Sequence, residues 1–300
     1  MQERSKDASR IVLGTVALGV PYGFSSDGQP SVDEANEIFK LSHISGITRF
    51  DTAPSYGQAE HLLGQYMHNN KAQKNDVWTK LSNLKLGPNL GKEVAGSLQN
   101  SLSVLSCDSV EYLQWHNWNA GMMNHPHFLE AWELLRGHNR INGLGVSTYG
   151  VQDALAAVKS GLFDLVQIEW NLLNQSVLNA IGKLASQNGV KIALRSIFLQ
   201  GVLTPKGENL PHHLLQLAAP RERAARLAID FDMPINALAL RAALDHPAKP
   251  YVLIGPDRLS QLQEIVGHSK LDVLTESQLK LITTLNEEEN PMVDPRNWQR

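Results

Sequence analysis

Short apolar or β-branched runs recur along the whole chain, and a longer stretch with apolar residues at helical spacing follows most of them. Most runs are apolar at consecutive positions, which is typical of parallel strands buried on both faces and unlike a half-solvated antiparallel sheet. The pattern therefore predicts eight strands, at Ile11–Thr15, Ile47–Asp51, Val77–Lys80, Val110–Trp115, Gly143–Ser147, Leu165–Glu169, Val190–Leu194 and Tyr251–Ile254.

The stretches between these runs carry helix signals. Ser31 and Glu34 have the spacing of a capping box, and Ala35, Ile38 and Phe39 then fall on one helical face. Comparable apolar stripes occur at Val94, Leu98 and Leu102, at Val151, Leu155 and Val158, and at Val177, Ile181 and Ala185. The predicted strands are thus separated by amphipathic helices that can cover a parallel sheet.

Eight alternations of strand and helix, without a linker or a shift in composition, predict a single-domain α/β fold, the (β/α)8 TIM barrel. Residues 1–10 are expected to form a flexible N-terminus, residues 11–285 the barrel, and residues 286–300 a C-terminal tail. A doubly wound open sheet is the alternative, but no G-x-G-x-x-G follows the first strand. The longest gap between strands, from Gln200 to Pro250, should place a loop over the active face.

Composition narrows the classes of partner. The chain of 300 residues has 27 basic and 30 acidic side chains spread along its length, so a nucleic-acid partner is not expected. Cys107 is the single cysteine, which fits a reducing compartment. The apolar run at 11–20 is too short and too glycine-containing to span a bilayer. We therefore expect a cytoplasmic protein without a membrane segment.

Polar side chains stand at the C-terminal ends of three consecutive predicted strands, where the site of a barrel lies. Asp51, Lys80 and His116 occupy these ends, and Tyr56 follows in the loop after the first. A tyrosine has an ordinary pKa of about 10, and a nearby ammonium favours the phenolate and lowers that pKa. Asp51 would pair with Lys80, and His116 could orient a substrate oxygen.

Each of these residues has a purely structural explanation when taken alone. An aspartate at a strand end is often a hydrogen-bond acceptor for a loop, and Lys80 could be an ordinary strand-end lysine. His116 has Trp115 and Trp118 beside it and could be a packed side chain. Their order on adjacent strands favours a joint acid–base site over three unrelated positions.

Residues 46–64 have the sequence GITRFDTAPSYGQAEHLLG, which contains the specific element Phe-Asp-Thr-Ala-x-x-Tyr-Gly. This segment strongly resembles the signature of the aldo-keto reductase family. The resemblance covers residues 11 to about 265 in the family's order and continues at Trp78–Lys80, Tyr112–His116, Gly143–Ser147, Gln167–Leu173, Gly201–Leu203, Ile254–Gly255 and Gln261–Glu264.

The resemblance implies an NADP(H)-dependent oxidoreductase that interconverts a small-molecule carbonyl and an alcohol, with the extended nucleotide held in a barrel. It implies Tyr56 as general acid in reduction and general base in oxidation. Lys80 and Asp51 would tune Tyr56, and His116 would position the carbonyl. The implied cofactor-binding positions are Gly14, Thr15, Ser147, Thr148, Gln167, Arg195, Ser196, Phe198, Gln200, Gly201, Leu203, Gly255, Arg258, Gln261 and Glu264.

Several positions depart from the family pattern. Thr148 stands where an Asn is usual and has no amide to offer, and Arg195 stands where many members stack a Tyr on the nicotinamide. A guanidinium plane can also stack, but it adds positive charge beside a ring that is cationic when oxidised. Asp257 lies at the position implied to be near the 2′-phosphate, often Arg, Lys or Ser, and Ile265 replaces a frequent Asn. NADP(H) is the expected cofactor and NAD(H) the alternative.

Four aromatic residues follow or end the first and fourth strands and are expected to line a substrate pocket: Tyr22, Phe24, Trp115 and Trp118. At least one of them is expected to serve only in packing.

His125 and His127, like His212 and His213, have no acidic partner at metal-site spacing, so no metal is expected.

Two other classes of function remain open. A regulatory or sensor protein of the same fold would bind NADPH with little turnover, although all four catalytic positions are intact. An unrelated barrel enzyme is the other class. A metal-dependent hydrolase would need a strand-end His-x-His, and an aldolase would use Lys80 to form a Schiff base.

Overall fold

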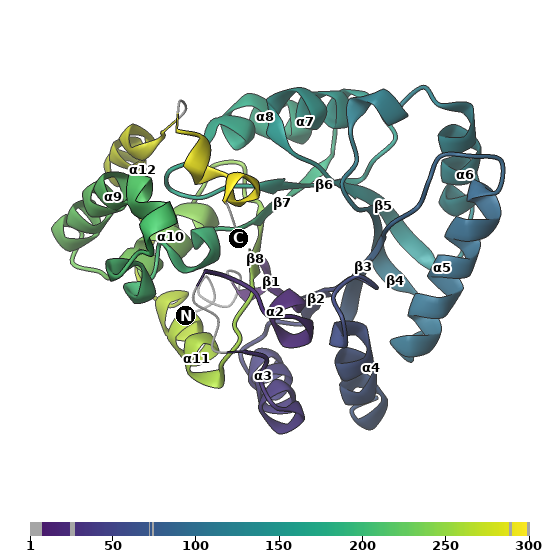
Figure 1. Cartoon of the computed structure of the whole chain (residues 1–300), viewed down its shortest axis with the longest axis horizontal. Helices are drawn as coiled ribbons and strands as arrows, with labels where there is room; N and C mark the ends of the chain where they lie inside the picture. Colours follow the sequence, from purple (N-terminus) through teal and green to yellow (C-terminus); the bar gives the residue numbers. More distant parts are fainter. Residues whose placement is uncertain (1–7, 25–27, 72, 74, 288–289, 299–300) are drawn as a thin grey trace.

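The computed structural model describes residues 8–24, 28–71, 73, 75–287 and 290–298. Within these residues, eight parallel strands close into a barrel in chain order (Figure 1). The strands are β1 (Ile11–Gly14), β2 (Arg49–Asp51), β3 (Asp76–Leu81), β4 (Val110–Trp115), β5 (Ile141–Ser147), β6 (Leu165–Glu169), β7 (Lys191–Arg195) and β8 (Tyr251–Ile254). The predicted single-domain (β/α)8 fold is confirmed. Most of the N-terminus predicted to be flexible lies outside the described residues.

The helices form an outer layer around the strands (Figure 1). They are α2 (Val16–Gly19), α3 (Val32–Ile44), α4 (Ala59–Asn69), α5 (Leu90–Val104), α6 (Pro126–Arg136), α7 (Gly150–Lys159), α8 (Ser176–Gln187), α9 (Ala218–Asp230), α10 (Ile235–Leu244), α11 (Leu259–His268) and α12 (Glu276–Ile282). Short 3₁₀ turns are η1 (Ala120–Met122), η2 (Leu199–Gly201), η3 (Pro205–Glu208), η4 (His212–Leu217), η5 (Thr283–Leu285), η6 (Pro291–Val293) and η7 (Pro295–Asn297).

The observed strands differ from the predicted ones mainly at their ends. Ile141 pairs with Val110, so β5 begins two residues before the predicted Gly143. Arg195 pairs with Glu169, so β7 extends one residue beyond the predicted Leu194. Polar residues are included because ladder hydrogen bonds use the backbone and do not depend on side-chain polarity.

The predicted capping box at Ser31 is half formed. The Ser31 hydroxyl accepts a hydrogen bond from the Glu34 backbone N–H at 3.1 Å, as expected for an N-cap. The Glu34 carboxylate, however, accepts from the Leu259 backbone N–H at 3.1 Å. Because Leu259 begins α11, this carboxylate joins the first turns of α3 and α11. The Glu34 carboxylate therefore binds the distant Leu259 N–H in place of the local Ser31 N–H that a capping box would use.

Side chains at alternate positions of a strand point into the barrel. Toward the N-terminal ends of the strands these side chains are aromatic. The Trp78 ring packs edge-on against Tyr112 and Tyr251, with ring centroids 5.3 and 5.2 Å apart. Two residues further along the same strands, the next inward-pointing side chains are Lys80 after Trp78 and Gln114 after Tyr112. The interior is therefore packed at the N-terminal ends of the strands and polar at their C-terminal ends.

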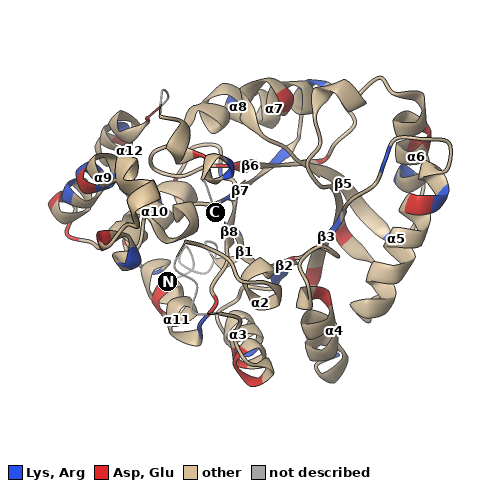
Figure 2. Ribbon diagram, viewed as in Figure 1, with Lys and Arg blue, Asp and Glu red and all other residues tan. Residues whose placement is uncertain are grey.

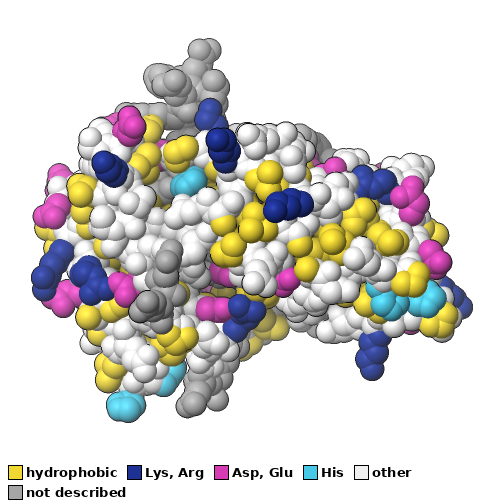
Figure 3. Space-filling model, turned by 90° about the horizontal axis from the view of Figure 1, so that it is seen from above, with side chains coloured by type: hydrophobic (Ala, Val, Ile, Leu, Met, Phe, Trp, Pro, Cys, Tyr) yellow, Lys and Arg dark blue, Asp and Glu magenta, His cyan; other side chains and the backbone are white. Residues whose placement is uncertain are grey.

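The outer surface carries both signs of charge. Positions of Lys, Arg, Asp and Glu are interspersed along the outer helices in Figure 2, and side chains of both signs occur on the face shown in Figure 3. Within the described part of the chain, no helix is both long enough and apolar enough to cross a membrane.

Candidate active site

A buried ion pair lies at the C-terminal ends of β2 and β3. Lys80 Nζ is 2.5 Å from Asp51 Oδ1 and donates a second hydrogen bond to the Thr52 carbonyl at 3.0 Å. Burial disfavours the charge of Lys80, but Asp51 and Tyr56 outweigh it and raise the pKa of Lys80 above its ordinary value. Lys80 is therefore an ammonium at neutral pH, and the expected pairing with Asp51 is present.

Tyr56 is held beside this ion pair by a close approach of two backbone segments. A Cβ placed on Gly19, the last residue of α2, would lie 1.8 Å from the Tyr56 carbonyl oxygen. A Cβ on Gly57, which has a φ of 55°, would lie 2.3 Å from the Gly19 carbonyl oxygen. Only glycine fits at both positions. The Lys80 ammonium lies 4.9 Å from the centroid of the Tyr56 ring.

The pKa of Tyr56 differs from the expectation. Burial raises the pKa of the Tyr56 phenol above its ordinary value of 10, and the opposing effect of the Lys80 ammonium is smaller. Asp51 adds to the rise because a second negative charge near it is unfavourable. Tyr56 is therefore a protonated phenol at neutral pH and can act as a proton donor.

His116 packs against Tyr56. The two rings meet edge to face, with centroids 5.8 Å apart. Burial and the Lys80 ammonium lower the pKa of His116 to about 4, so the imidazole is neutral at pH 7. Its Nδ1 is 3.1 Å from the Ser82 hydroxyl, which is itself 3.3 Å from the Ser55 hydroxyl. Ser82 was not among the residues predicted from the sequence.

Two glutamine amides complete the surroundings of Asp51. Gln114 Nε2 and Gln167 Nε2 each donate to Asp51 Oδ2 at 3.0 Å, and Gln167 also donates to Gln114 Oε1 at 3.1 Å. Sequence reasoning missed Gln114. A signal was present, because Gln114 lies two residues before His116 and therefore points to the same side of β4. The carboxylate of Asp51 is thus held in place by three donors.

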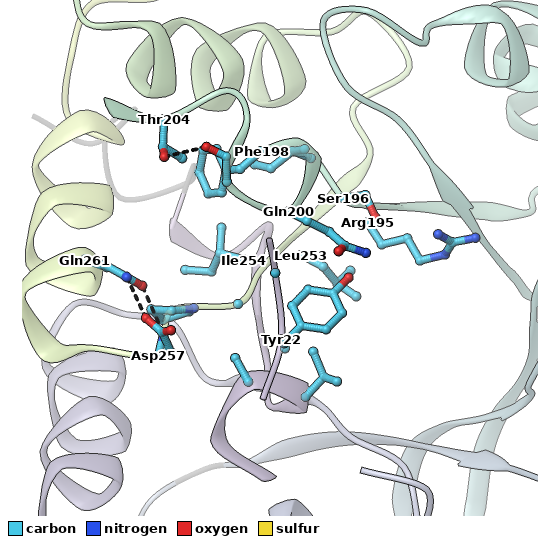
Figure 4. Close-up of a pocket in the computed structure, with 18 of the residues that line it drawn as sticks. Tyr22, Arg195, Ser196, Phe198, Gln200, Thr204, Leu253, Ile254, Asp257 and Gln261 are labelled. Carbon is cyan, nitrogen blue, oxygen red and sulfur yellow. Dashed lines mark hydrogen bonds between the residues drawn. The ribbon is translucent and has the colours of Figure 1, made fainter. Parts of the chain in front are cut away.

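A cavity of about 340 Å³ opens beside Tyr56, which is within the usual range for a small-molecule site. Figure 4 shows Tyr22 and Arg195 toward one end of the cavity and Asp257 with Gln261 toward the other. The predicted site residues that line it are Gly14, Tyr22, Asp51, Tyr56, Gln167, Arg195, Ser196, Phe198, Gln200, Gly201, Gly255, Gln261 and Glu264. The wall also contains positions that the sequence did not single out, among them Thr204, Pro205, Lys206 and Asn236.

Other predicted site residues lie outside this lining, which does not include Thr15, Phe24, Lys80, Trp115, His116, Trp118, Ser147, Thr148, Leu203 or Arg258. Trp115 packs edge-on against Phe128, and Trp118 against Phe163, with both tryptophans buried under the helices. The Thr148 hydroxyl donates to the Trp118 carbonyl at 2.9 Å. The side chains of Trp115, Trp118 and Thr148 are therefore engaged in packing or backbone contacts.

Arg195 is part of a stacked arrangement at the cavity edge. Its guanidinium lies 4.1 Å from the centroid of the Tyr149 ring, and the Arg296 guanidinium lies 3.7 Å from the same centroid. Arg195 Nη2 also pairs with Glu169 Oε2 at 3.0 Å. The charge that was expected to act on the nicotinamide is therefore balanced by Glu169, and Arg296 brings the C-terminal segment to this place.

The other end of the cavity contains a buried carboxylate. Asp257, which is 6% exposed, accepts a hydrogen bond from Gln261 Nε2 at 2.6 Å (Figure 4). Gln261 Oε1, the side-chain amide oxygen, in turn accepts from the Asp257 backbone N–H at 3.0 Å. The Arg258 guanidinium donates to the carbonyls of Asp257 and Gly28 at 2.6 and 3.4 Å.

Within the residues that the structure describes, no group of three or more His, Cys, Asp or Glu side chains could hold a metal ion. His125 and His127 lie close, with ring centroids 5.5 Å apart. Burial raises the pKa of the Cys107 thiol to about 11, so it is not a nucleophilic thiolate at neutral pH.

Known proteins share both the sequence pattern and the architecture. A family model described as the aldo/keto reductase family matches residues 10–287. The aldo-keto reductase YhdN of Bacillus subtilis is 27% identical, with 96% of this chain and 92% of that protein covered. The D-threo-aldose 1-dehydrogenase of a Pseudomonas species is 24% identical, with 91% and 95% covered.

Among solved structures, the holo form of aldo-keto reductase AKR11C1 from Bacillus halodurans superposes with a TM-score of 0.76. That pair is 20% identical in sequence and covers 92% of this chain and 91% of the other, a level of identity that supports the shared barrel. The match of the family model spans nearly the whole chain, from before β1 to beyond α12. The chain belongs to the aldo/keto reductase family.

Proposed function

We propose that this protein is an NAD(P)(H)-dependent oxidoreductase that interconverts a carbonyl and an alcohol by hydride transfer. The observation that carries the proposal is the buried Asp51–Lys80 ion pair beside a protonated Tyr56 at the wall of the cavity. A phenol with a raised pKa is a weak acid in water, but a fixed ammonium beside it stabilises the phenolate that forms when the proton leaves.

In the direction of reduction, Tyr56 donates its proton to the carbonyl oxygen as negative charge develops on it. Lys80 remains charged throughout and stabilises the Tyr56 phenolate, while Asp51 keeps Lys80 in place. Neutral His116 donates a hydrogen bond to the same substrate oxygen and orients it. These groups are positioned before the reaction, so they need little reorganisation in the transition state. In oxidation, the Tyr56 phenolate acts as the base.

The residues of the cavity fit a nicotinamide dinucleotide, which supplies or accepts the hydride when bound. The cavity continues from Tyr56 to α11, so it can take an elongated ligand. Gln167 has its amide in the wall near Asp51 and can bind the carboxamide of the nicotinamide. The backbone at Gly14, Gly201 and Gly255 allows a ligand to approach closely, because these wall positions carry no side chain.

Family resemblance favours NADP(H), but the adenosine end supports NAD(H) as well. The Asp257 carboxylate lies in the cavity wall at the position implied to be near the ribose 2′-oxygen. A carboxylate can accept a hydrogen bond from a 2′-hydroxyl, whereas it repels a 2′-phosphate. We infer that Asp257 favours NAD(H) relative to the family members that have Arg, Lys or Ser at this position.

The substrate class that we propose is an aldehyde, a ketone or a sugar. The Pseudomonas relative is a dehydrogenase of D-threo-aldoses, which supports sugars as substrates worth testing. Tyr22 lies in the cavity wall together with Tyr56 and Arg195, and its ring offers both an apolar face and a hydroxyl to a small substrate.

The decisive experiment combines nucleotide binding with turnover. NADPH and NADH binding is measured by fluorescence titration, and turnover is measured on a panel of aldehydes, ketones and sugars. The variant Tyr56→Phe should lower kcat by at least about 100-fold, because it removes the proton donor. Its nucleotide affinity should stay within about twofold of wild type. Tyr112→Phe, in the aromatic packing at the N-terminal ends of the strands, is the matched control and should retain most of the kcat.

Two outcomes would change the conclusion. If the protein binds neither nucleotide, the proposed function is wrong. Tight nucleotide binding without turnover on the whole panel would favour a regulatory or sensor protein of the same fold.

A further inference from the structure

Asn236 is a buried amide whose oxygen has no hydrogen-bond partner. Its side chain is 4% exposed, and Asn236 Oδ1 is among the buried atoms that find no donor within the described residues. Leaving such an acceptor unsatisfied costs free energy, so a native protein usually retains one only where a ligand or a water molecule satisfies it. Asn236 also lines the cavity beside Tyr56.

The place of Asn236 in the fold puts it at the adenosine end of this cavity. It is the second residue of α10, which packs against α11. On α11, the cavity-lining residues Gln261, Glu264 and Ile265 recur at intervals of three and four and therefore share one helical face. The resemblance to the family assigns Gln261 and Glu264 to the adenosine end.

Compared with the family pattern, the same face of α11 lacks a side-chain amide. Ile265, which replaces a frequent Asn of the family, offers only hydrocarbon to the cavity. Asn236 brings an amide to the cavity from the neighbouring helix. An Asn side chain is complementary to adenine, because its oxygen can accept from the N6 amino group while its NH₂ donates to a ring nitrogen.

We propose, on the basis of the nucleotide-binding function above, that Asn236 binds the adenine ring of the dinucleotide through its side-chain amide. Because Oδ1 has no accessible surface in the ligand-free cavity, a rotation of the side-chain amide about the Cβ–Cγ bond brings this unsatisfied atom to the N6 amino group. Asn236 thereby takes the place of the amide that is missing at Ile265. Its contribution concerns binding and base recognition and leaves the proton transfer at Tyr56 unchanged.

The test uses two fragments of the nucleotide and the variant Asn236→Leu, which is nearly isosteric. Binding of ADP-ribose and of reduced nicotinamide mononucleotide is measured by calorimetry or fluorescence. The variant should bind ADP-ribose about tenfold more weakly, within the range for loss of a bidentate amide–adenine contact. It should bind reduced nicotinamide mononucleotide as wild type does. Asn179→Leu, on the exposed face of α8, is the control and should change neither value.

Thermal unfolding of the ligand-free protein gives a second readout. Because Asn236→Leu removes an unsatisfied buried amide, it should raise Tm by about 2 to 4 °C. A lower Tm would mean that the amide supports the fold, which would overturn the proposal. Unchanged affinity for ADP-ribose, or equal weakening of both fragments, would also overturn it. If wild type binds neither ADP-ribose nor NADH nor NADPH, the proposed function itself fails.

Discussion

At the scale of single residues, Ser82 is expected to fix the proton on His116. The imidazole is neutral because burial and Lys80 lower its pKa to about 4, so one ring nitrogen carries a hydrogen. When the Ser82 hydroxyl, 3.1 Å away, donates to Nδ1, the hydrogen resides on Nε2 and can be donated to a carbonyl oxygen. Ser82→Ala should therefore lower kcat by about tenfold and mix the two tautomers, which nitrogen NMR of labelled histidine detects.

The control for Ser82 is the next hydroxyl along the same chain of contacts. Ser55 is exposed and its hydroxyl lies 3.3 Å from that of Ser82, so Ser55→Ala should change kcat much less. The prediction also requires that the affinity for NADH stays unchanged in Ser82→Ala. An unaltered kcat together with an unaltered tautomer would show that Ser82 does not position His116.

The meeting of Asp51, Lys80 and His116 could be predicted because each lies at or next to the C-terminal end of a strand, and parallel strands bring these ends together. The roles proposed for Ser82 and Asn236 could not, since they depend on which atoms lie within hydrogen-bonding distance after folding. The pKa of Tyr56 was beyond sequence reasoning for the same reason. Spacing indicates a nearby ammonium, but it does not say how much solvent the phenol loses.

At the scale of elements, the turn between β8 and α11 is expected to select the nucleotide. Asp257→Ser removes a buried carboxylate from the cavity wall, at the end away from Tyr56. The ratio of the Kd for NADPH to the Kd for NADH should fall by about tenfold, because the repulsion of the 2′-phosphate is relieved. Fluorescence titration of both nucleotides measures this ratio.

Asp257→Asn separates charge from shape at the same position. This variant keeps the size of the side chain and should also lower the ratio. Glu264→Gln removes the charge of another carboxylate in the wall, one that pairs with His268, and should have a smaller effect. A ratio that stays constant in both Asp257 variants would mean that the carboxylate does not face the 2′-oxygen.

Most elements could be predicted because consecutive apolar runs and helical stripes are local properties of the sequence. Contacts between elements were harder to predict from the sequence. Glu34 has the spacing of a capping box, yet its carboxylate binds the first turn of α11, which is 225 residues away. The stretch after β7 was expected to be a loop over the active face, and it contains the 3₁₀ turns η2, η3 and η4. Arg221 fixes part of it by donating to the carbonyls of Val202 and Thr204.

At the scale of the whole molecule, two half-buried histidines at opposite ends of the barrel should make stability depend on pH. His116 lies at the C-terminal ends of the strands, and His246 follows α10 in the connection that leads into β8. Burial lowers the pKa of His246 to about 4, as burial and Lys80 do for His116. In the unfolded chain both histidines return to an ordinary pKa of about 6.5.

Between pH 6.5 and pH 4 the unfolded chain therefore binds more protons than the folded protein, so the free energy of unfolding falls as the pH decreases through this window. Above pH 6.5 the contribution is fully present. Each histidine accounts for at most about 3 kcal/mol of the free energy of unfolding, from its shift in pKa.

Urea unfolding at pH 7.5 and at pH 4.5 measures the loss of stability between these two pH values. His246→Gln, away from the cavity wall, should remove about half of the histidine-dependent loss while keeping kcat. If this variant loses as much stability as wild type between the two pH values, His246 does not contribute to the pH dependence of stability through a lowered pKa.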